Sequence, residues 1–409
     1  MAILQFQMPR AIKKPEPSHP LSTKHPAMPD QSPCLLPLDE AVLTRTLADW
    51  KSSHPEMGVL ALLPMAEKDQ LATLQDTCRR LSIPLTGGIF PELVTENGFS
   101  SSGVWLLRFD QMIPAFLISN LGGPPGQAAA RIASSVEPDL DRLGTRPTLY
   151  LVVDALLQHI ATMLDELYLR LADRVTYAGV AAGNETFLPT PCVFDANRAI
   201  SGGALALLIP DDVKTVLEHG FVSPENVMTA TATIGNRIVS IDWKPAFEVY
   251  RDIVRAERDV VLDRGNFYQW AVSYPFGILR ANGELVVRIP VALADDDSVF
   301  CIGEVPENAM LVVLRAPDFE TDNCAEILAR KITENTVAGM DANLLVFYCA
   351  GRRLHLKSWA EKEIRKLGEC SGAKKLAGAL SLGEIGSTTP GGYPLFHNAT
   401  LVCTPLSRA

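Results

Sequence analysis

The chain has 409 residues, of which 47% are hydrophobic, and a formal net charge of −10 at pH 7. A chain of this length can bury the cores of two domains, and its hydrophobic fraction is that of a globular protein. The negative charge argues against a general nucleic-acid or anionic-membrane surface, because such surfaces need clustered lysine and arginine.

Cysteine usage and the first residues predict a cytoplasmic protein. The eight cysteines are scattered and form no C-x-x-C pair, which indicates reduced thiols. The N-terminus carries its charges after a very short apolar stretch, which is not the order of a secretory signal. No apolar run approaches the roughly 18 residues that a membrane-spanning helix needs. We therefore expect no membrane insertion.

Residues 1–42 are expected to form a flexible arm. Eight prolines lie between Met1 and Glu40, and the apolar residues there show almost no periodicity. This composition is typical of a disordered or adherent segment. A docking segment and a plain tail both fit it.

The first domain is expected over residues 43–242, where short apolar runs alternate with helical patterns. The predicted strands are Gly58–Leu63, Leu85–Phe90, Val104–Phe109, Leu149–Asp154, Tyr177–Ala182, Pro191–Phe194 and Ala204–Ile209. The predicted helices are Lys68–Leu81, Pro125–Ser135 and Ala155–Leu171. Because several short strands follow one another directly, antiparallel pairing is favoured over a doubly wound parallel sheet.

The second domain is expected over residues 243–409. A hairpin through Gly235-Asn236 precedes it, helices are predicted over Pro245–Val261, and a β meander over Tyr274–Arg315. Two further helices flank a strand at Leu344–Cys349. The predicted fold class is α+β, with two α/β-layered domains whose mixed, mostly antiparallel sheets are flanked by helices. An echo between GGIFPE and LGEIG is compatible with an ancient duplication and equally with a chance match.

The segment Ser381–Leu401 combines many glycines with few polar side chains. Glycines such as Gly383 let a backbone approach a ligand closely, so this composition suits a small-molecule pocket. The polar residues are Glu384, His397 and Asn398, and Arg352 with Arg353 comes from upstream. Glu384 is expected beside one of these arginines, either as part of a ligand site or as a structural ion pair. His397 equally fits a functional or a structural role.

Arg288 interrupts an apolar strand pattern. It stands between Val287 and Ile289, on the same strand face as Val286. If that face belongs to the core, the guanidinium is buried and must be paired. If it does not, Arg288 is a surface residue.

Several motifs resemble one known family. The order CAGR (Cys349–Arg352), GEIG (Gly383–Gly386) and HN-x-T (His397–Thr400) resembles the C-terminal half of FIST proteins, which are intracellular ligand-sensing modules in signal transduction. The segments IGNRIVSIDWKPAFEVY and GEVPENAMLVVL extend the resemblance upstream, and LTGGIFPEL with AGVAAGNETFLPTPCVF carries it more loosely into the first half. The resemblance covers the chain from about Gly58 to its end.

The resemblance implies a sensor that binds amino acids or similar metabolites. The ligand-binding candidates are Arg352, Glu384, His397, Asn398, Gly383, Arg288 and Asn184, the last standing where the family usually has an aspartate. Because the sequence contains no kinase, cyclase or methyl-accepting segment, the output is expected from a separate protein such as a histidine kinase.

Three alternatives remain at this point. Some FIST-like proteins resemble haem-based nitric oxide sensors, for which His397, His355 or Cys349 would hold the iron. A scaffold that binds no ligand is the second. The third is a cysteine-nucleophile enzyme using Cys349, His397 and Asn398, although no G-x-S-x-G, Walker or kinase motif is present, and we expect no enzyme. The histidine spacings also predict no metal site.

Overall fold

The computed structural model describes residues 33–143, 146–186, 188–210, 212–258, 260–281, 283–317, 323–335, 343–387 and 392–406. Of the expected arm, residues 1–32 lie outside this described part. Cys34–Leu36 forms a strand, β1, and Asp39 caps the first helix by accepting a hydrogen bond from the Val42 amide at 2.9 Å. The folded part of the chain therefore starts before residue 42.

Most of the molecule consists of three copies of one topology, here called units. Each unit runs strand, helix, strand, helix, strand, hairpin, strand. The first unit contains β1 (Cys34–Leu36), α1 (Glu40–Ser53), β2 (Gly58–Pro64), the 3-10 helix η1 (Met65–Gln70), α2 (Leu71–Arg80), β3 (Leu85–Phe90), β4 (Leu93–Thr95), β5 (Gly98–Ser100) and β6 (Val104–Phe109).

The second unit contains β7 (Ala115–Ile118), α3 (Pro125–Leu143), β8 (Thr148–Asp154), α4 (Ile160–Leu171), the 3-10 helix η2 (Ala172–Arg174), β9 (Thr176–Ala182), β10 (Val193–Asp195), β11 (Ala199–Ile200) and β12 (Ala204–Ile209). The third contains β13 (Val216–Glu218), α7 (Cys324–Asn335), β22 (Asn343–Cys349), α8 (Ala350–Leu356), α9 (Ser358–Ser371), β23 (Leu376–Ser381), β24 (Glu384–Gly386), β25 (Leu395–His397) and β26 (Leu401–Leu406).

Strand pairing follows the same rule in every unit. The two strands joined by a helical crossover are parallel (β2–β3, β8–β9 and β22–β23), as such a connection requires. The last strand of each unit lies antiparallel between the first strand and the parallel pair. The result is three six-stranded mixed sheets.

Each unit gives its hairpin to the sheet of another unit. The β4–β5 hairpin pairs with β23 of the third unit, and β10–β11 pairs with β3 of the first. The β24–β25 hairpin completes the exchange by pairing with β9 of the second unit. Strands from the two sides of the expected boundary near residue 242 therefore share two of these three sheets.

One glycine recurs at the same place in all three units. Gly87, Gly179 and Gly378 each stand three residues before the end of β3, β9 or β23. A Cβ atom there would lie 2.3, 2.1 or 1.7 Å from the carbonyl oxygen of the residue opposite on the parallel strand. Only glycine fits such a close backbone approach. GGIFPE begins at this glycine of the first unit, whereas LGEIG begins four residues after the equivalent Gly378, so the two segments do not occupy equivalent positions.

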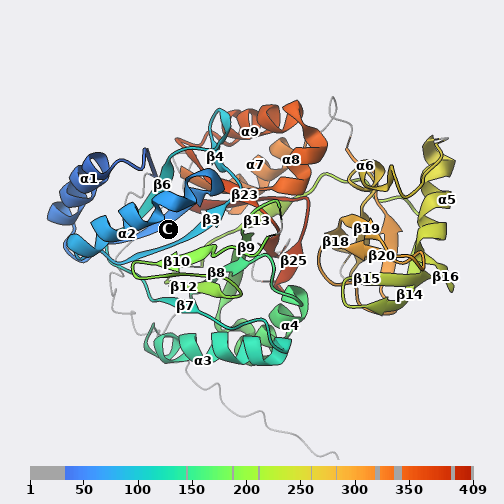
Figure 1. The fold of residues 1–409 in the computed structure, drawn as a ribbon, viewed down its shortest axis with the longest axis horizontal. Coiled ribbons are helices and arrows are strands. Elements are labelled where there is room, and N and C mark those ends of the chain that lie inside the picture. The colour runs from blue at the N-terminus through green and yellow to red at the C-terminus, as the bar shows by residue number, and fades with distance from the viewer. Residues whose placement is uncertain are drawn as a thin grey trace, which may run out of the picture.

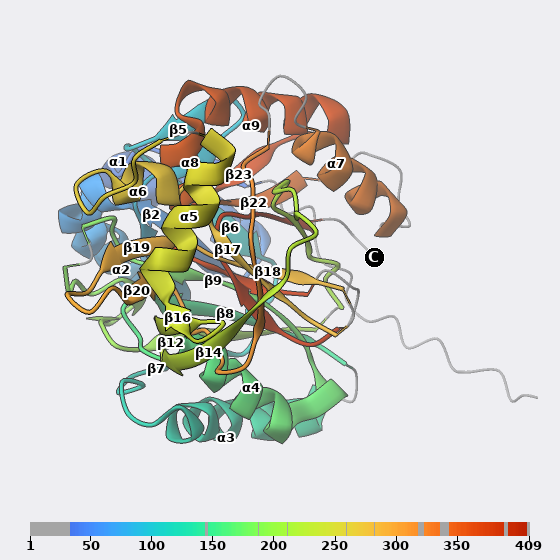
Figure 2. The ribbon, with the colours of Figure 1, turned by 90° about the vertical axis from the view of Figure 1, so that its right-hand side faces the viewer.

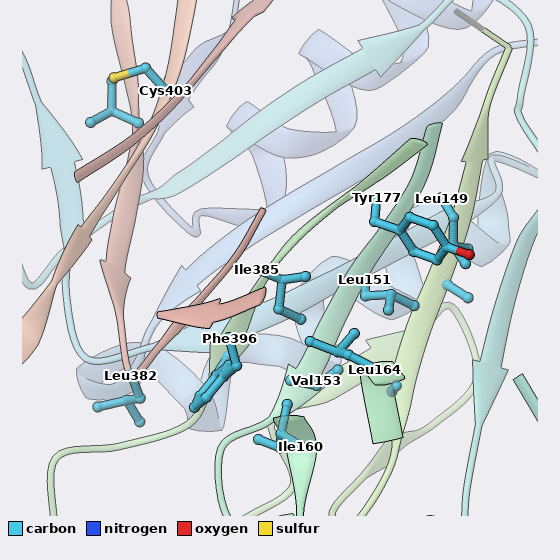
Figure 3. Packing of buried hydrophobic residues seen from close by; sticks show 14 of the residues in the cluster. Leu149, Leu151, Val153, Ile160, Leu164, Tyr177, Leu382, Ile385, Phe396 and Cys403 are labelled. Carbon is cyan, nitrogen blue, oxygen red and sulfur yellow. The ribbon is translucent and has the colours of Figure 1, made fainter. Parts of the chain in front are cut away.

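The three sheets pack face to face, and helices cover their outer faces. On β8, Leu149, Leu151 and Val153 belong to a cluster with α3 and α4, whereas Tyr150 and Val152 belong to one with strand residues of the other two sheets. This alternation is that of strands buried on both faces. Figure 2 shows α3 and α4 at the bottom, α7 and α9 at the top, and α1 and α2 at the left. Figure 3 shows Ile385 and Phe396 of the exchanged third hairpin beside Leu151 and Ile160 of the second unit.

A β-rich module is inserted into the third unit between β13 and α7. It contains β14 (Met228–Ile234), β15 (Arg237–Ile241), β16 (Lys244–Pro245), α5 (Ala246–Arg258), α6 (Phe267–Ala271), β17 (Phe276–Leu279), β18 (Leu285–Arg288), β19 (Pro290–Leu293), β20 (Val299–Cys301) and β21 (Met310–Val313). The module has its own aromatic core around Tyr250, Phe267 and Phe276. It lies to one side of the three units, at the right in Figure 1.

The predicted fold class is confirmed: mixed and antiparallel sheets are flanked by helices.

The start of helix α4 differs from the prediction. The helix predicted from Ala155 begins only at Ile160, because His159 adopts a left-handed conformation (φ 61°, ψ 39°) that interrupts the helical path. Residues 155–159 are instead a loop at the end of β8. Among the described helices, none combines the length and apolar character needed to cross a bilayer.

Candidate functional site

A cavity of about 720 Å³ lies between the second unit and the inserted module. One wall is the loop from β8 to α4, and the opposite wall comes from the β14–β15 turn and the segment after β20. The lining residues are Ala155, Leu156, Leu157, Gln158, His159, Ile160, Ile234, Gly235, Asn236, Tyr268, Val291, Cys301, Ile302, Gly303, Glu304 and Phe396. This volume lies within the range of sites that hold small organic ligands.

The cavity exposes large apolar side chains. Leu156 is 37% exposed, Ile234 67% and Tyr268 45%, although each lies beside other apolar residues. Grouped exposed apolar side chains on a folded protein commonly mark a surface that a ligand or partner covers. The polar groups among them are few, as expected for a pocket that orients a mostly apolar molecule.

Glu304 connects the inserted module with the start of α4. Its carboxylate accepts hydrogen bonds from the Ala161 amide at 2.8 Å and from the Thr162 hydroxyl at 2.5 Å, and it lies 3.2 Å from His159 Nδ1. An acceptor from another element thus satisfies backbone groups that a helix N-terminus leaves free. Because Glu304 also lines the cavity, this cap stands where the cavity meets the boundary between the second unit and the inserted module.

Arg288 is buried at the same junction and donates only to carbonyl groups among its described contacts. Its Nε donates to the Glu304 carbonyl at 2.8 Å, and one terminal nitrogen donates to the Phe396 carbonyl at 2.8 Å and the Val287 carbonyl at 3.0 Å. Burial lowers the pKa of the guanidinium to about 10, which leaves it charged at neutral pH. Arg288 is therefore buried and paired, and its partners are carbonyl oxygens. The guanidinium also lies over the Phe396 ring, with its carbon 5.9 Å from the ring centre.

The expected pairing of Glu384 with an arginine is wrong. Glu384 is fully buried, and its carboxylate accepts hydrogen bonds of 2.5 Å from the Ser381 and Thr400 hydroxyls. Burial raises its pKa to about 7. Arg352 instead forms a buried two-bond ion pair with Glu363, which also accepts from the Tyr348 hydroxyl. Arg353 pairs with Glu92 of the first unit. The sequence could not show which carboxylate pairs with Arg352, because Glu363 reaches this arginine only when α9 folds back over β22.

His397 is the last residue of strand β25 and Asn398 follows it, and both side chains are buried. His397 lies opposite Glu384 in the β24–β25 ladder, and its pKa is lowered to about 3 by burial and by the charge of Arg288. Neither ring nitrogen of His397 and neither side-chain polar atom of Asn398 has a hydrogen-bond partner among the described residues. Arg288 binds the carbonyl just before this pair. Arg352 reaches the Ala399 carbonyl just after it, at 3.5 Å.

Gly383 and Asn184 serve local geometry. A Cβ on Gly383 would meet the Phe396 ring at 2.3 Å, so the glycine permits this packing. The Asn184 amide donates to the Leu188 carbonyl at 3.1 Å and its oxygen accepts from the Thr186 amide at 2.9 Å, which closes a turn after β9. Of the seven predicted ligand residues, none lines the 720 Å³ cavity. Their role in ligand binding stays a prediction.

The residues suggested as haem ligands lie away from the apolar cavity. Neither Cys349, His355 nor His397 lines the apolar cavity. Burial and the Glu384 charge raise the pKa of the Cys349 thiol to about 12, so the thiolate that would bind iron or act as a nucleophile is scarce at neutral pH. Within the described residues, no three His, Cys, Asp or Glu side chains gather in a way that could hold a metal ion.

Sequence reasoning missed the cavity loop and Glu304. Glu304 stands in the segment GEVPENAMLVVL, but nothing local shows that it caps a helix more than 140 residues earlier. The sequence holds one signal for the loop. If residues 155–171 formed one helix, His159 would lie off its apolar stripe. A loop explains that mismatch.

Comparison with protein families agrees with the motif reading. Residues 59–244 match the FIST N domain and residues 246–387 match the FIST C domain. No curated protein matches the chain at a significant level.

Proposed function

Because the chain belongs to the FIST family, whose domains generally act as sensors in signal transduction, we propose that it detects a small molecule in the cavity between the second unit and the inserted module. The observation that carries this proposal is the apolar cavity itself, with Leu156, Ile234 and Tyr268 exposed along it. A bound apolar molecule would remove this surface from water, which favours binding.

The walls narrow the chemistry of the ligand. The resemblance implies amino acids or similar metabolites, and a cavity of about 720 Å³ favours large, mainly apolar ones. The Glu304 carboxylate faces the same space, so a ligand anion placed beside it would be repelled. We therefore expect a neutral or cationic group at the His159 and Glu304 end, with the apolar part against Leu156 and Ile234.

A ligand here contacts both walls of the junction at once. Binding that favours one placement of the inserted module over another would change the surface that a partner protein meets, with couplings commonly of about 1 to 3 kcal/mol. The partner is proposed to be a separate output protein, such as a histidine kinase, in the cytoplasm.

A metabolite thermal-shift screen tests the proposal. Ligands that raise the melting temperature of the wild type should have a much smaller effect in Leu156→Trp, because the larger indole occupies the part of the cavity next to residue 156. Leu169→Trp is the matched control: Leu169 lies on α4, is 77% exposed and does not line the cavity. No stabilising metabolite, or equal stabilisation in Leu156→Trp and the wild type, would refute a sensor site here.

A further inference from the structure

A second, polar groove of about 830 Å³ lies on another part of the inserted module. It is formed by the end of α5, the turn between α6 and β17, the segment after β21 and one residue of α8. Its polar side chains are Glu257, Arg258, Ser273, Tyr274, Arg315 and His355. The groove shares no lining residue with the cavity between the second unit and the module.

Two arginines from different segments reach this groove. Arg258 donates from Nε to the Tyr274 hydroxyl and lies with its guanidinium carbon 5.9 Å from the centre of that ring. This hydrogen bond fixes the side chain through Nε, and the two terminal nitrogens of Arg258 take no part in it. Arg315 is held by the Glu257 carboxylate, with Nε at 2.9 Å and Nη2 at 2.7 Å from the same oxygen. Both guanidinium groups are thus positioned before any ligand arrives, which lowers the entropic cost of binding.

His355 and Ser273 close the other side. The Ser273 hydroxyl lies 3.3 Å from His355 Nδ1. Burial and, to a smaller extent, the charges of Arg352 and Lys357 lower the pKa of His355 to about 4, so its imidazole is neutral at neutral pH. The groove carries two arginines against one glutamate, together with hydroxyl and imidazole groups, and this set suits an anion that accepts several hydrogen bonds.

We propose that this groove binds the phosphate group of a small phosphorylated metabolite, with Arg258 and Arg315 as its cationic contacts. Arg315 already has Glu257 as a partner, so a monoanionic carboxylate would gain little there. A phosphate brings close to two charges and three acceptor oxygens, enough to engage both arginines. The groove is larger than a phosphate ion, which leaves room for the organic part of the ligand.

Calorimetry and melting temperatures with inorganic phosphate, AMP, acetate and sodium chloride at matched ionic strength test this proposal. We expect phosphate and AMP to bind and to raise the melting temperature above that in chloride, with AMP tighter. Arg258→Gln and Arg315→Gln should each weaken both affinities at least tenfold. Arg255→Gln removes the same charge from the last turns of α5 outside the groove and should bind within twofold of the wild type.

Equal responses to phosphate and chloride would overturn the site, as would wild-type affinity in Arg258→Gln. Acetate binding as tightly as phosphate would overturn the choice of phosphate. Failure here leaves the apolar cavity untouched, because Leu156→Trp probes that cavity separately.

Discussion

Glu304 of the inserted module and Thr162 of α4 are joined by a hydrogen bond of 2.5 Å from the threonine hydroxyl to the carboxylate. The two residues are 142 positions apart in the sequence. The same carboxylate caps the helix through the Ala161 amide, and only 9% of the residue is exposed. A single side chain thus ties the module to the second unit at the edge of the proposed ligand cavity.

Replacing this carboxylate should loosen the junction. In Glu304→Gln the side chain keeps its size but loses the negative charge at the α4 N-terminus and one acceptor oxygen. We expect the free energy of unfolding to fall by about 1 to 3 kcal/mol, as for other charge-assisted bonds in partly buried sites. Urea denaturation measures the change. Glu307→Gln, an exposed position in the same segment, is the control and should stay within about 0.5 kcal/mol of the wild type. Equal stability of the two variants would show that the contact contributes nothing.

Local patterns predicted many of the elements but missed α1 and β7, and they predicted long-range pairing poorly. The strand at Leu344–Cys349 and the hairpin through Gly235-Asn236 lie where periodicity and turn residues place them. The exchange of hairpins among three sheets left no local trace, because β4 has the same apolar composition whether it pairs within its own unit or with β23. Topology of this kind depends on contacts between distant segments.

The candidate residues show the same division. Arg288 was recognised as unusual because a charge inside an apolar strand is rare, and it is buried. Its partners are carbonyl oxygens, which every residue has, so no sequence pattern could name them. Glu304 drew no attention because a glutamate in a hairpin segment is ordinary. Its importance comes only from the helix end that the fold places beside it.

The buried Glu384 carboxyl predicts an unusual pH dependence. Its pKa rises from 4.5 in the unfolded chain to about 7 in the folded protein, so the folded state binds more protons between these values. The stability contributed by the protonated form is fully present below pH 4.5 and is lost as the pH rises through 7, an effect of roughly 3 kcal/mol. Glu384→Gln cannot titrate. From pH 5 to pH 8 the wild type should therefore lose stability relative to the variant. The other titrating groups are the same in both proteins, so they do not contribute to this difference. A difference independent of pH would mean that Glu384 titrates normally.

His397 should act in the opposite direction. Its pKa falls from 6.5 to about 3 on folding, so the unfolded chain binds more protons as the pH drops, and stability is lost below pH 6.5. In His397→Leu this loss disappears, and the substitution also removes two buried nitrogens that have no hydrogen-bond partner in the described part of the chain. At pH 5 we expect the variant to be the more stable by about 2 kcal/mol, with a smaller gain at pH 7.5. Guanidinium denaturation at both pH values measures this. A variant that is less stable at pH 5 would show that His397 has a partner worth keeping.

The recurring glycine offers a test of the three-unit architecture. In Gly378→Ala the new methyl group would lie 1.7 Å from the Val346 carbonyl oxygen, a backbone atom that cannot move without opening the parallel pair β22–β23. Gly87→Ala meets the Ala61 carbonyl at 2.3 Å in the equivalent pair of the first unit. Both substitutions should cost more than about 3 kcal/mol, because overpacking against backbone belongs to the most destabilising class of change. Gly122→Ala has nothing within 4 Å of its new atom and should be nearly neutral in thermal denaturation. If Gly378→Ala has the melting temperature of the wild type while that of Gly87→Ala is lowered, the two glycines do not have the same role. The first and third units would then not be equivalent at this strand.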